Sequence, residues 1–168
     1  MMRRVPALAC AAVLLGSCTS VRLPADGQVQ FDPVRYFAGW SHGTGTLRIA
    51  LSAPQRVMVE SVGTPLPGGG LRLRQSVQQG DNAPRNREWR IVRVGPNRYS
   101  GTLTDAAGPV TITTAGPRAV IRYRMPGGMA VRQQLALQAD GRTLLNHMTV
   151  TKWGVRVARL DETIRKLD

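Results

Sequence analysis

The sequence predicts an all-β fold, a single antiparallel up-and-down β-barrel of about eight to ten strands. From residue 31 onward, stretches of six to twelve residues rich in Val, Ile, Thr, Leu and aromatic residues alternate with short Gly, Pro, Asn and Asp breaks, which is typical of strands joined by tight turns. No window of 15 residues shows a sustained helical period, so we expect little helix. We favour a barrel over a sandwich because closure removes exposed strand edges.

Each expected element follows from local patterning. The first is a single turn around residues 33–37, which precedes the strands. Several strands alternate at period two: Ile121 and Tyr123 oppose Arg122 and Arg124, as in a strand with one buried face. Turn-forming residues separate the strands. We place the strands at 39–51, 55–63, 70–78, 87–94, 98–105, 109–114, 118–125, 129–138, 142–152 and 154–165.

The first eighteen residues predict a lipoprotein signal peptide. Arg3 and Arg4 precede an apolar run over residues 7–16, and small residues follow, which is the order of a secretory signal. The run is shorter than the roughly 20 residues of a membrane-spanning helix. Residues 15–18, Leu-Gly-Ser-Cys, resemble the bacterial lipobox, in which the cysteine is acylated and becomes the new amino terminus. We therefore expect a signal peptide over 1–17, lipidated Cys18 and a tether over 18–30, and a barrel domain over 31–168.

Cysteine usage separates this interpretation from an ordinary secretory signal with an incidental cysteine. Cys10 would leave with the signal, so Cys18 would be the sole thiol of the mature chain, with no disulfide partner. A multiply acylated cysteine is a durable membrane anchor. Thr19 follows the cysteine where an Asp would favour the inner membrane. We therefore expect a periplasm-facing protein of the bacterial cell envelope, with the outer membrane favoured.

The chain is strongly basic. Loss of Arg3 and Arg4 lowers the formal net charge from +13 to +11, and the pI is about 11.5. Such charge raises nucleic acid as a partner, but no nucleic-acid-binding motif is visible and a periplasmic location argues against it. The arginines alternate along expected strands, as at Arg72 and Arg74, which indicates a solvated sheet face. Beside anionic lipid, each well-placed charge would add about 1 kcal/mol of attraction.

Residues that could carry chemistry are sparse. His42 and His147 lie on expected strands near opposite ends of the domain, and neither belongs to a metal-binding or histidine–carboxylate motif. Most acidic residues fall at turns or at the termini. Residues 68–70, Gly-Gly-Gly, lack the helix and the Lys-Ser/Thr of a phosphate-binding loop, so they indicate a hairpin turn. We expect no catalytic residue, no metal site and no cofactor.

Three segments resemble a known family, the small bacterial lipocalin-like lipoproteins grouped as a domain of unknown function. The segments are the opening at 31–40, the Arg-x-Trp strand at 87–91 with the Tyr-x-Gly-x-x-x-Asp-x-x-Gly hairpin at 99–108, and the Asn-to-Lys-Trp-Gly region at 144–157. The resemblance implies a lipocalin-like (calycin) barrel and membrane anchoring, and it brings no established reaction. Gln75, or a neighbour, stands where the family tends to carry glutamate, and His147 where it commonly has arginine. If either charge serves a ligand, this protein binds differently or less tightly.

A small barrel has room for one small ligand, and several residues are candidates for lining it. We expect Trp40 to plug the barrel floor, with Arg156 or Arg159 over its ring. The alternative is that the aromatic candidates fill the core and that Asp105 satisfies the turn before Gly108. A buried unpaired lysine at Lys152 would be costly. The candidate ligand-binding residues are Trp40, Trp89, Tyr99, Asp105, Tyr123, Asn146 and Lys152.

Three functional hypotheses remain open at this point. The leading one is a membrane-anchored envelope lipoprotein that binds or carries a small apolar ligand such as a fatty acid or lipid. The alternative is a non-enzymatic structural or interaction lipoprotein with a filled barrel and a basic face that contacts membrane or protein. The third, an enzyme acting on lipids, requires Asp105, Lys152 or His147 to converge in an open pocket. An open rather than a filled interior would favour the first.

Overall fold

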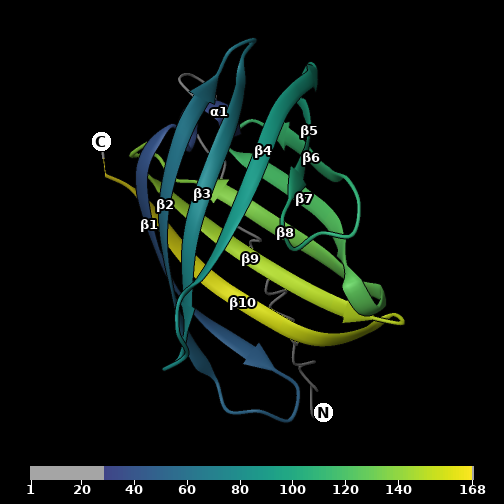
Figure 1. The fold of residues 1–168 in the computed structure, drawn as a ribbon. Coiled ribbons are helices and arrows are strands. Elements are labelled where there is room, and N and C mark those ends of the chain that lie inside the picture. Colours follow the sequence, from purple (N-terminus) through teal and green to yellow (C-terminus); the bar gives the residue numbers. More distant parts are fainter. Residues whose placement is uncertain (1–28, 168) are drawn as a thin grey trace, which may run out of the picture.

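A computed structural model describes residues 29–167 of the protein. The expected signal peptide, Cys18 and tether residues 18–28 lie outside the described residues. Ten strands close into one antiparallel barrel in which each pairs with its neighbours in sequence and β1 pairs with β10 (Figure 1). The all-β, up-and-down barrel is confirmed. The elements are α1 (Pro33–Tyr36), β1 (Gly39–Ile49), β2 (Gln55–Leu66), β3 (Gly70–Gln79), β4 (Arg85–Gly95), β5 (Arg98–Leu103), β6 (Val110–Ala115), β7 (Arg118–Met125), η1 (Pro126–Gly128), β8 (Met129–Leu137), β9 (Thr143–Lys152) and β10 (Val155–Lys166).

The strand ends follow the turn residues closely. The largest difference is at β2, which we expected to end at residue 63 and which continues to Leu66. Gly68 and Gly69 both adopt positive φ angles, a conformation that costs glycine little. The resulting tight turn lets Leu66 pair with Gly70, so the hairpin has no room for a longer loop. No helix among residues 29–167 is long and apolar enough to cross a membrane.

Aromatic side chains close one end of the barrel. The rings of Phe31, Tyr36 and Phe37 pack on one another, with the Tyr36 and Phe37 centroids 5.0 Å apart. The Tyr36 hydroxyl donates to the carbonyl oxygens of Arg142 (2.8 Å) and Ile164 (3.2 Å), and burial raises its pKa. Asp32 caps α1 by accepting from the Val34 amide at 2.9 Å. The cap helix is therefore joined to the ends of β9 and β10.

This arrangement corrects the expected role of Trp40. Its side chain is 56% exposed, whereas Ser41 beside it is 2% exposed and faces inward. Side chains alternate along a strand, so Trp40 faces outward and the aromatic cluster around α1 occupies the floor instead. Arg159 is paired in register with Arg48, far along β1 from Trp40, and Arg156 lies still further along β10. The expected contact of either arginine with the Trp40 ring is wrong.

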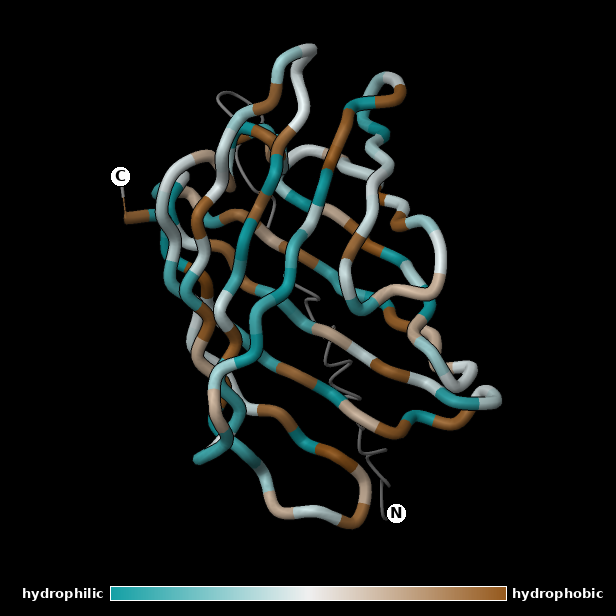
Figure 2. Tube along the Cα trace, viewed as in Figure 1, coloured by the Kyte–Doolittle hydropathy of each residue, from teal (hydrophilic) through white to brown (hydrophobic). Residues whose placement is uncertain are grey.

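The barrel interior has two apolar regions. The larger cluster includes Leu71, Ile112 and Leu144 and extends from the aromatic end through most of the barrel. A smaller one, formed by Val57, Val59 and Leu160, lies toward the other end. Figure 2 shows hydrophobic and hydrophilic residues alternating along the strands, as this one-sided burial requires. The two clusters leave space between and beside them, and that space contains the candidate site.

Candidate functional site

A cavity of about 470 Å³ lies inside the barrel. It reaches Asn82 and Ala83 in the β3–β4 connection, at the end opposite α1. It continues into a smaller chamber of about 40 Å³ that extends to Phe37 at the closed end. Near the mouth, apolar side chains such as Val57 and Leu160 line the cavity together with polar side chains such as Gln79, Asn82 and Arg85. The lining residues common to both spaces are Val59, Arg87, Gln133, Asn146 and Glu162.

Gln75 is hydrogen-bonded to the polar groups on one side of the inner end of the cavity, which we call the cavity floor. Its side-chain oxygen accepts from Arg87 Nε at 2.8 Å and from Trp89 Nε1 at 2.7 Å. Its amide nitrogen donates to Ser61 Oγ at 3.0 Å. β3 and β4 place the three side chains on the inner face, because Gln75 and Arg87 are opposite each other in register. A neutral amide at position 75 leaves the charge of Arg87 uncompensated by this neighbour.

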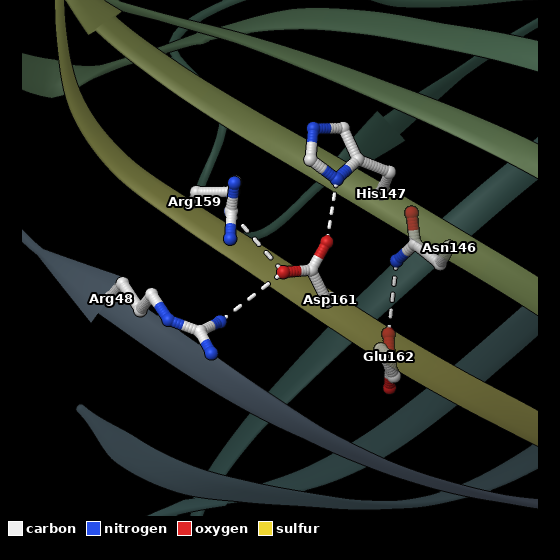
Figure 3. A network of polar contacts seen from close by, with 6 residues as sticks. All are labelled: Arg48, Asn146, His147, Arg159, Asp161 and Glu162. Atoms are coloured by element: carbon white, nitrogen blue, oxygen red, sulfur yellow. Dashed lines mark hydrogen bonds and ion pairs between the residues drawn. The ribbon is translucent and has the colours of Figure 1, made fainter.

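A carboxyl group occupies the other side of the floor. Glu162 Oε2 on β10 accepts from Asn146 Nδ2 on β9 at 2.9 Å (Figure 3). Gly43 on β1 provides the space, since a Cβ there would lie 2.3 Å from Glu162 Oε1. Burial raises the pKa of Glu162, and the Asn146 hydrogen bond and the charges of Arg87 and His42 partly oppose the increase. The cavity floor therefore has the Arg87 guanidinium on one side and the Glu162 carboxyl on another.

Tyr123 and Gln133 complete the lining between these two sides. Gln133 Nε2 donates to the Tyr123 hydroxyl at 3.3 Å, and the Tyr123 ring packs edge-on against Trp89 with centroids 5.8 Å apart. Burial raises the pKa of Tyr123. Asp105 also lines the cavity, and its carboxylate lies 3.9 Å from the Arg85 guanidinium. The cavity therefore combines apolar side chains with several polar groups, and polar groups in a pocket can fix the orientation of a ligand.

The structure brings together four of the seven predicted site residues: Trp89, Asp105, Tyr123 and Asn146. Tyr99 is buried outside the cavity, with the Arg93 guanidinium 4.6 Å from its ring centroid. Lys152 lies at the end of β9, where its ammonium packs 4.8 Å from the ring centroid of exposed Trp153. Tyr99 therefore belongs to the hydrophobic core, as the core-filling alternative has it, and none of Tyr99, Lys152 and Trp40 lines the cavity or the inner chamber.

The residues required by the enzyme hypothesis do not converge. His147 faces outward, and its Nδ1 lies 2.6 Å from Asp161 Oδ1 (Figure 3). Lys152 contacts Trp153, and Asp105 lies at the cavity wall beside Arg85. Within residues 29–167 there is also no cluster of three His, Cys, Asp or Glu side chains placed to hold a metal ion.

Sequence reasoning missed Arg87, Gln133 and Glu162 as site residues. A signal was present for Glu162, because it shares strand parity with Leu160 and Ile164, both of which are buried. Arg87 likewise lies on the same face of β4 as Trp89 and Ile91. A charged residue in the inward row of an otherwise apolar strand face is unusual unless it is paired or functional. Because most acidic residues fall at turns or at the termini, the inward position of Glu162 was not predicted.

Comparison with known proteins places the fold and the family. The structure is similar to that of the S-type phycobiliprotein lyase CPES from Guillardia theta, with a TM-score of 0.64 and 8% identity over 80% of this chain and 90% of that one. It also matches a redesigned β-barrel with a TM-score of 0.42 and 13% identity over 80% and 95% of the chains. No curated protein sequence matches. The fold is a lipocalin-like barrel, and because residues 12–166 match it, the chain belongs to the family described as "Protein of unknown function (DUF3833)".

Proposed function

We propose that this protein is a membrane-anchored envelope lipoprotein that binds or carries one small ligand with an apolar body, such as a fatty acid or another lipid. The observation that carries the proposal is the cavity of about 470 Å³ inside the barrel. Its volume falls in the range of about 300–1,000 Å³ that is usual for small-molecule pockets. An open interior also argues against the alternative of a filled barrel.

One part of the wall suits an apolar chain. Around the mouth, Leu47, Val57, Val77, Met148 and Leu160 line the cavity. Each CH₂ group buried against such a surface contributes about 0.8 kcal/mol. A chain inserted from the mouth would place its other end near the polar floor, where Arg87 is available to an acidic group. Affinity would come from the wall and orientation from the floor.

Anchoring through Cys18 is the second part of the proposal. The lipobox-like residues 15–18 support it, and the partner would be membrane lipid, in the outer membrane by the identity of Thr19. The described chain enters the barrel beside α1, where the Phe31 amide donates to the Gly116 carbonyl at 2.9 Å. The cavity mouth lies at the opposite end, so a tether at the closed end would leave ligand entry unobstructed.

Trp89 offers a direct test of ligand binding. It lines the inner chamber and is 5% exposed, whereas Trp40 and Trp153 are 56% and 86% exposed. We expect the full chain carrying Trp40→Phe and Trp153→Phe, purified in nanodiscs, to show saturable fluorescence quenching by a dibrominated fatty acid. Val57→Phe, which would fill the cavity wall, should weaken the quenching, while Met58→Phe on the outer side of β2 should leave it unchanged. Absence of saturable quenching would contradict the proposal.

One observation favours a further role as an interaction surface. On the outer side of β7 and β8, Arg122 and Arg132 lie directly opposite each other in register, and Arg124 is nearby. Like charges in such a pair destabilise a sheet unless an anion joins them. The three arginines line a surface groove together with Thr149 and Thr151. This basic groove is suited to anionic head groups, in keeping with the basic face of the alternative hypothesis.

A further inference from the structure

We propose that the cavity floor selects ligands whose polar end carries an O–H or N–H donor, which Asn146 and Glu162 accept. This inference rests on the proposed ligand-binding function and names the chemistry of the head group at that same site. The donor would be a hydroxyl or an amine on an otherwise apolar molecule. A ligand that ends in a group without a donor would leave the floor unsatisfied.

The first observation is an unpartnered acceptor. Asn146 is 6% exposed, and its Oδ1 is buried without a hydrogen-bond partner among the described residues. Its Nδ2 donates to Glu162 Oε2 at 2.9 Å, and Figure 3 shows the amide oxygen turned away from that carboxyl. Glu162 Oε2 accepts from the amide nitrogen, so the amide oxygen is left on the other side. Buried acceptors are normally paired, and Asn146 lines both the cavity and the inner chamber.

The second observation is the space kept for the Glu162 carboxyl. Gly43 lacks the Cβ that would approach Oε1 to 2.3 Å, and a Cβ at Gly45 would lie 2.5 Å from the Asp161 carbonyl oxygen. β1 therefore carries two glycines, which have no side chain, beside this part of β10. No hydrogen bond joins Glu162 Oε1 to another residue of the 29–167 range. The cavity lining thus has two acceptors without a hydrogen-bond partner among residues 29–167, Asn146 Oδ1 and Glu162 Oε1.

The opposite wall limits which head groups fit. Arg87 is held by its Nε bond to Gln75, and no ion pair within 4.0 Å joins it to Glu162 in the described part of the chain. A bare carboxylate could approach Arg87 but has no donor for Asn146 Oδ1. A hydroxyl or amine satisfies the acceptors, and an ester or phosphate oxygen beside it could accept from Arg87. The geometry therefore favours an amphiphile with a donor at its polar end over a simple fatty acid anion.

The test compares head groups on one chain length. In the full chain with Trp89 as sole tryptophan, twelve-carbon probes compete with the dibrominated fatty acid, with free concentrations corrected by partition into empty nanodiscs. Monododecanoylglycerol supplies hydroxyls, dodecylamine supplies an ammonium, and methyl dodecanoate has no donor. We expect at least one donor-bearing probe to compete at about tenfold lower concentration than methyl dodecanoate, the usual scale for one buried hydrogen bond.

Two variants link that preference to the floor. Asn146→Leu removes the unpartnered acceptor and should reduce the preference to less than about threefold without weakening methyl dodecanoate. Ser41→Ala is the matched control, because Ser41 Oγ is also buried without a hydrogen-bond partner among the described residues but lines neither the cavity nor the inner chamber, and this variant should keep the preference. Circular dichroism and melting curves establish that each variant folds.

The outcomes separate this inference from the proposed function. Equal competition by all three probes would overturn donor selection while leaving lipid binding intact. A preference that survives in folded Asn146→Leu would also overturn it. If no probe or fatty acid reaches Trp89, the proposed function fails, and this inference fails with it. Should Asn146→Leu not fold, the comparison of probes on the parent chain still decides the matter.

Discussion

Asp161 and Glu162 are consecutive residues of β10, and their carboxyl groups lie in different surroundings because they face opposite sides of the barrel wall. Asp161 faces outward, where Arg48 and Arg159 each lie 3.2 Å from it (Figure 3). The hydrogen bond from His147, followed by these charges, lowers the pKa of Asp161 despite some desolvation. Glu162 faces the cavity, where burial raises its pKa. Because strand side chains alternate, the same acid type serves a surface ion cluster in one position and an interior site in the next.

Glu162 should make the stability of the protein depend on pH. Its folded-state pKa lies above the ordinary value of 4.5, so the folded protein binds its proton more tightly than the unfolded chain does. The favourable contribution is complete below about pH 4.5 and is lost as pH rises through the folded pKa. We expect Glu162→Gln to remove this decline in urea unfolding measured from about pH 4 to about pH 8. Asp81→Asn, in an exposed turn, is the control, and a decline unchanged in Glu162→Gln would contradict the assignment.

Close backbone approaches tie the elements of the closed end together. A Cβ on Gly63 in β2 would lie 1.8 Å from the Phe37 carbonyl oxygen, and one on Gly101 in β5 would lie 1.9 Å from the Arg90 carbonyl oxygen. Backbone atoms cannot move aside as the end of a flexible side chain can. The segment that follows α1 therefore packs directly on β2, and this contact keeps the aromatic cluster in the barrel end.

We expect Gly63→Ala to destabilise the protein by about 2 kcal/mol or more, because overpacking against fixed backbone forces the chain to shift. Gly95→Ala is the matched control, since a Cβ there meets nothing within 4 Å and φ is not positive at this residue. Urea unfolding of both variants gives the comparison. Equal stability of the two would show that the Phe37 segment is not held against β2.

The hydroxyl of Tyr36 provides a second test at the level of elements. It bonds the carbonyl oxygens of Arg142 and Ile164, which joins α1 to β9 and β10. Tyr36→Phe keeps the ring packing and removes both bonds, so we expect a loss of about 1–2 kcal/mol in unfolding free energy. Faster hydrogen exchange should appear around residues 31–37 first. Unchanged exchange there would mean that ring packing alone holds α1.

The whole molecule combines an apolar interior with a strongly basic exterior. The formal net charge is +13, and arginines project from the outer sides of most strands. Their distribution is uneven, because the groove on β7 and β8 is lined by Arg122, Arg124 and Arg132, while some arginines elsewhere pair with acids, as Arg90 does with Glu88 at 3.2 Å. Such a field attracts anionic surfaces over about a Debye length, roughly 10 Å at 0.1 M salt.

This charge distribution predicts salt-sensitive binding to anionic vesicles. A chain beginning at Thr19 keeps all the described elements and lacks Cys18, so lipid anchoring cannot contribute. We expect Arg122→Gln, Arg124→Gln and Arg132→Gln together to weaken vesicle binding by about tenfold or more. The control replaces three exposed arginines elsewhere, Arg56, Arg74 and Arg98, by Gln and has the same net charge. Equal weakening by the two triple variants in co-sedimentation would assign binding to net charge and not to the groove.

The sequence by itself determined the element boundaries, because turn residues and period-two alternation are local properties of the chain. β7 occupies residues 118–125 as expected, and α1 (Pro33–Tyr36) forms where a turn was expected over 33–37. Cys18 lipidation and the envelope location stay predictions. Tertiary structure decided the cavity and its floor, where Gly43 makes room for Glu162, and Gln75 joins Arg87 to Trp89. It also turned Trp40 outward. Such contacts depend on the registers of all the strand pairs around the closed barrel, and no local sequence pattern specifies those registers together.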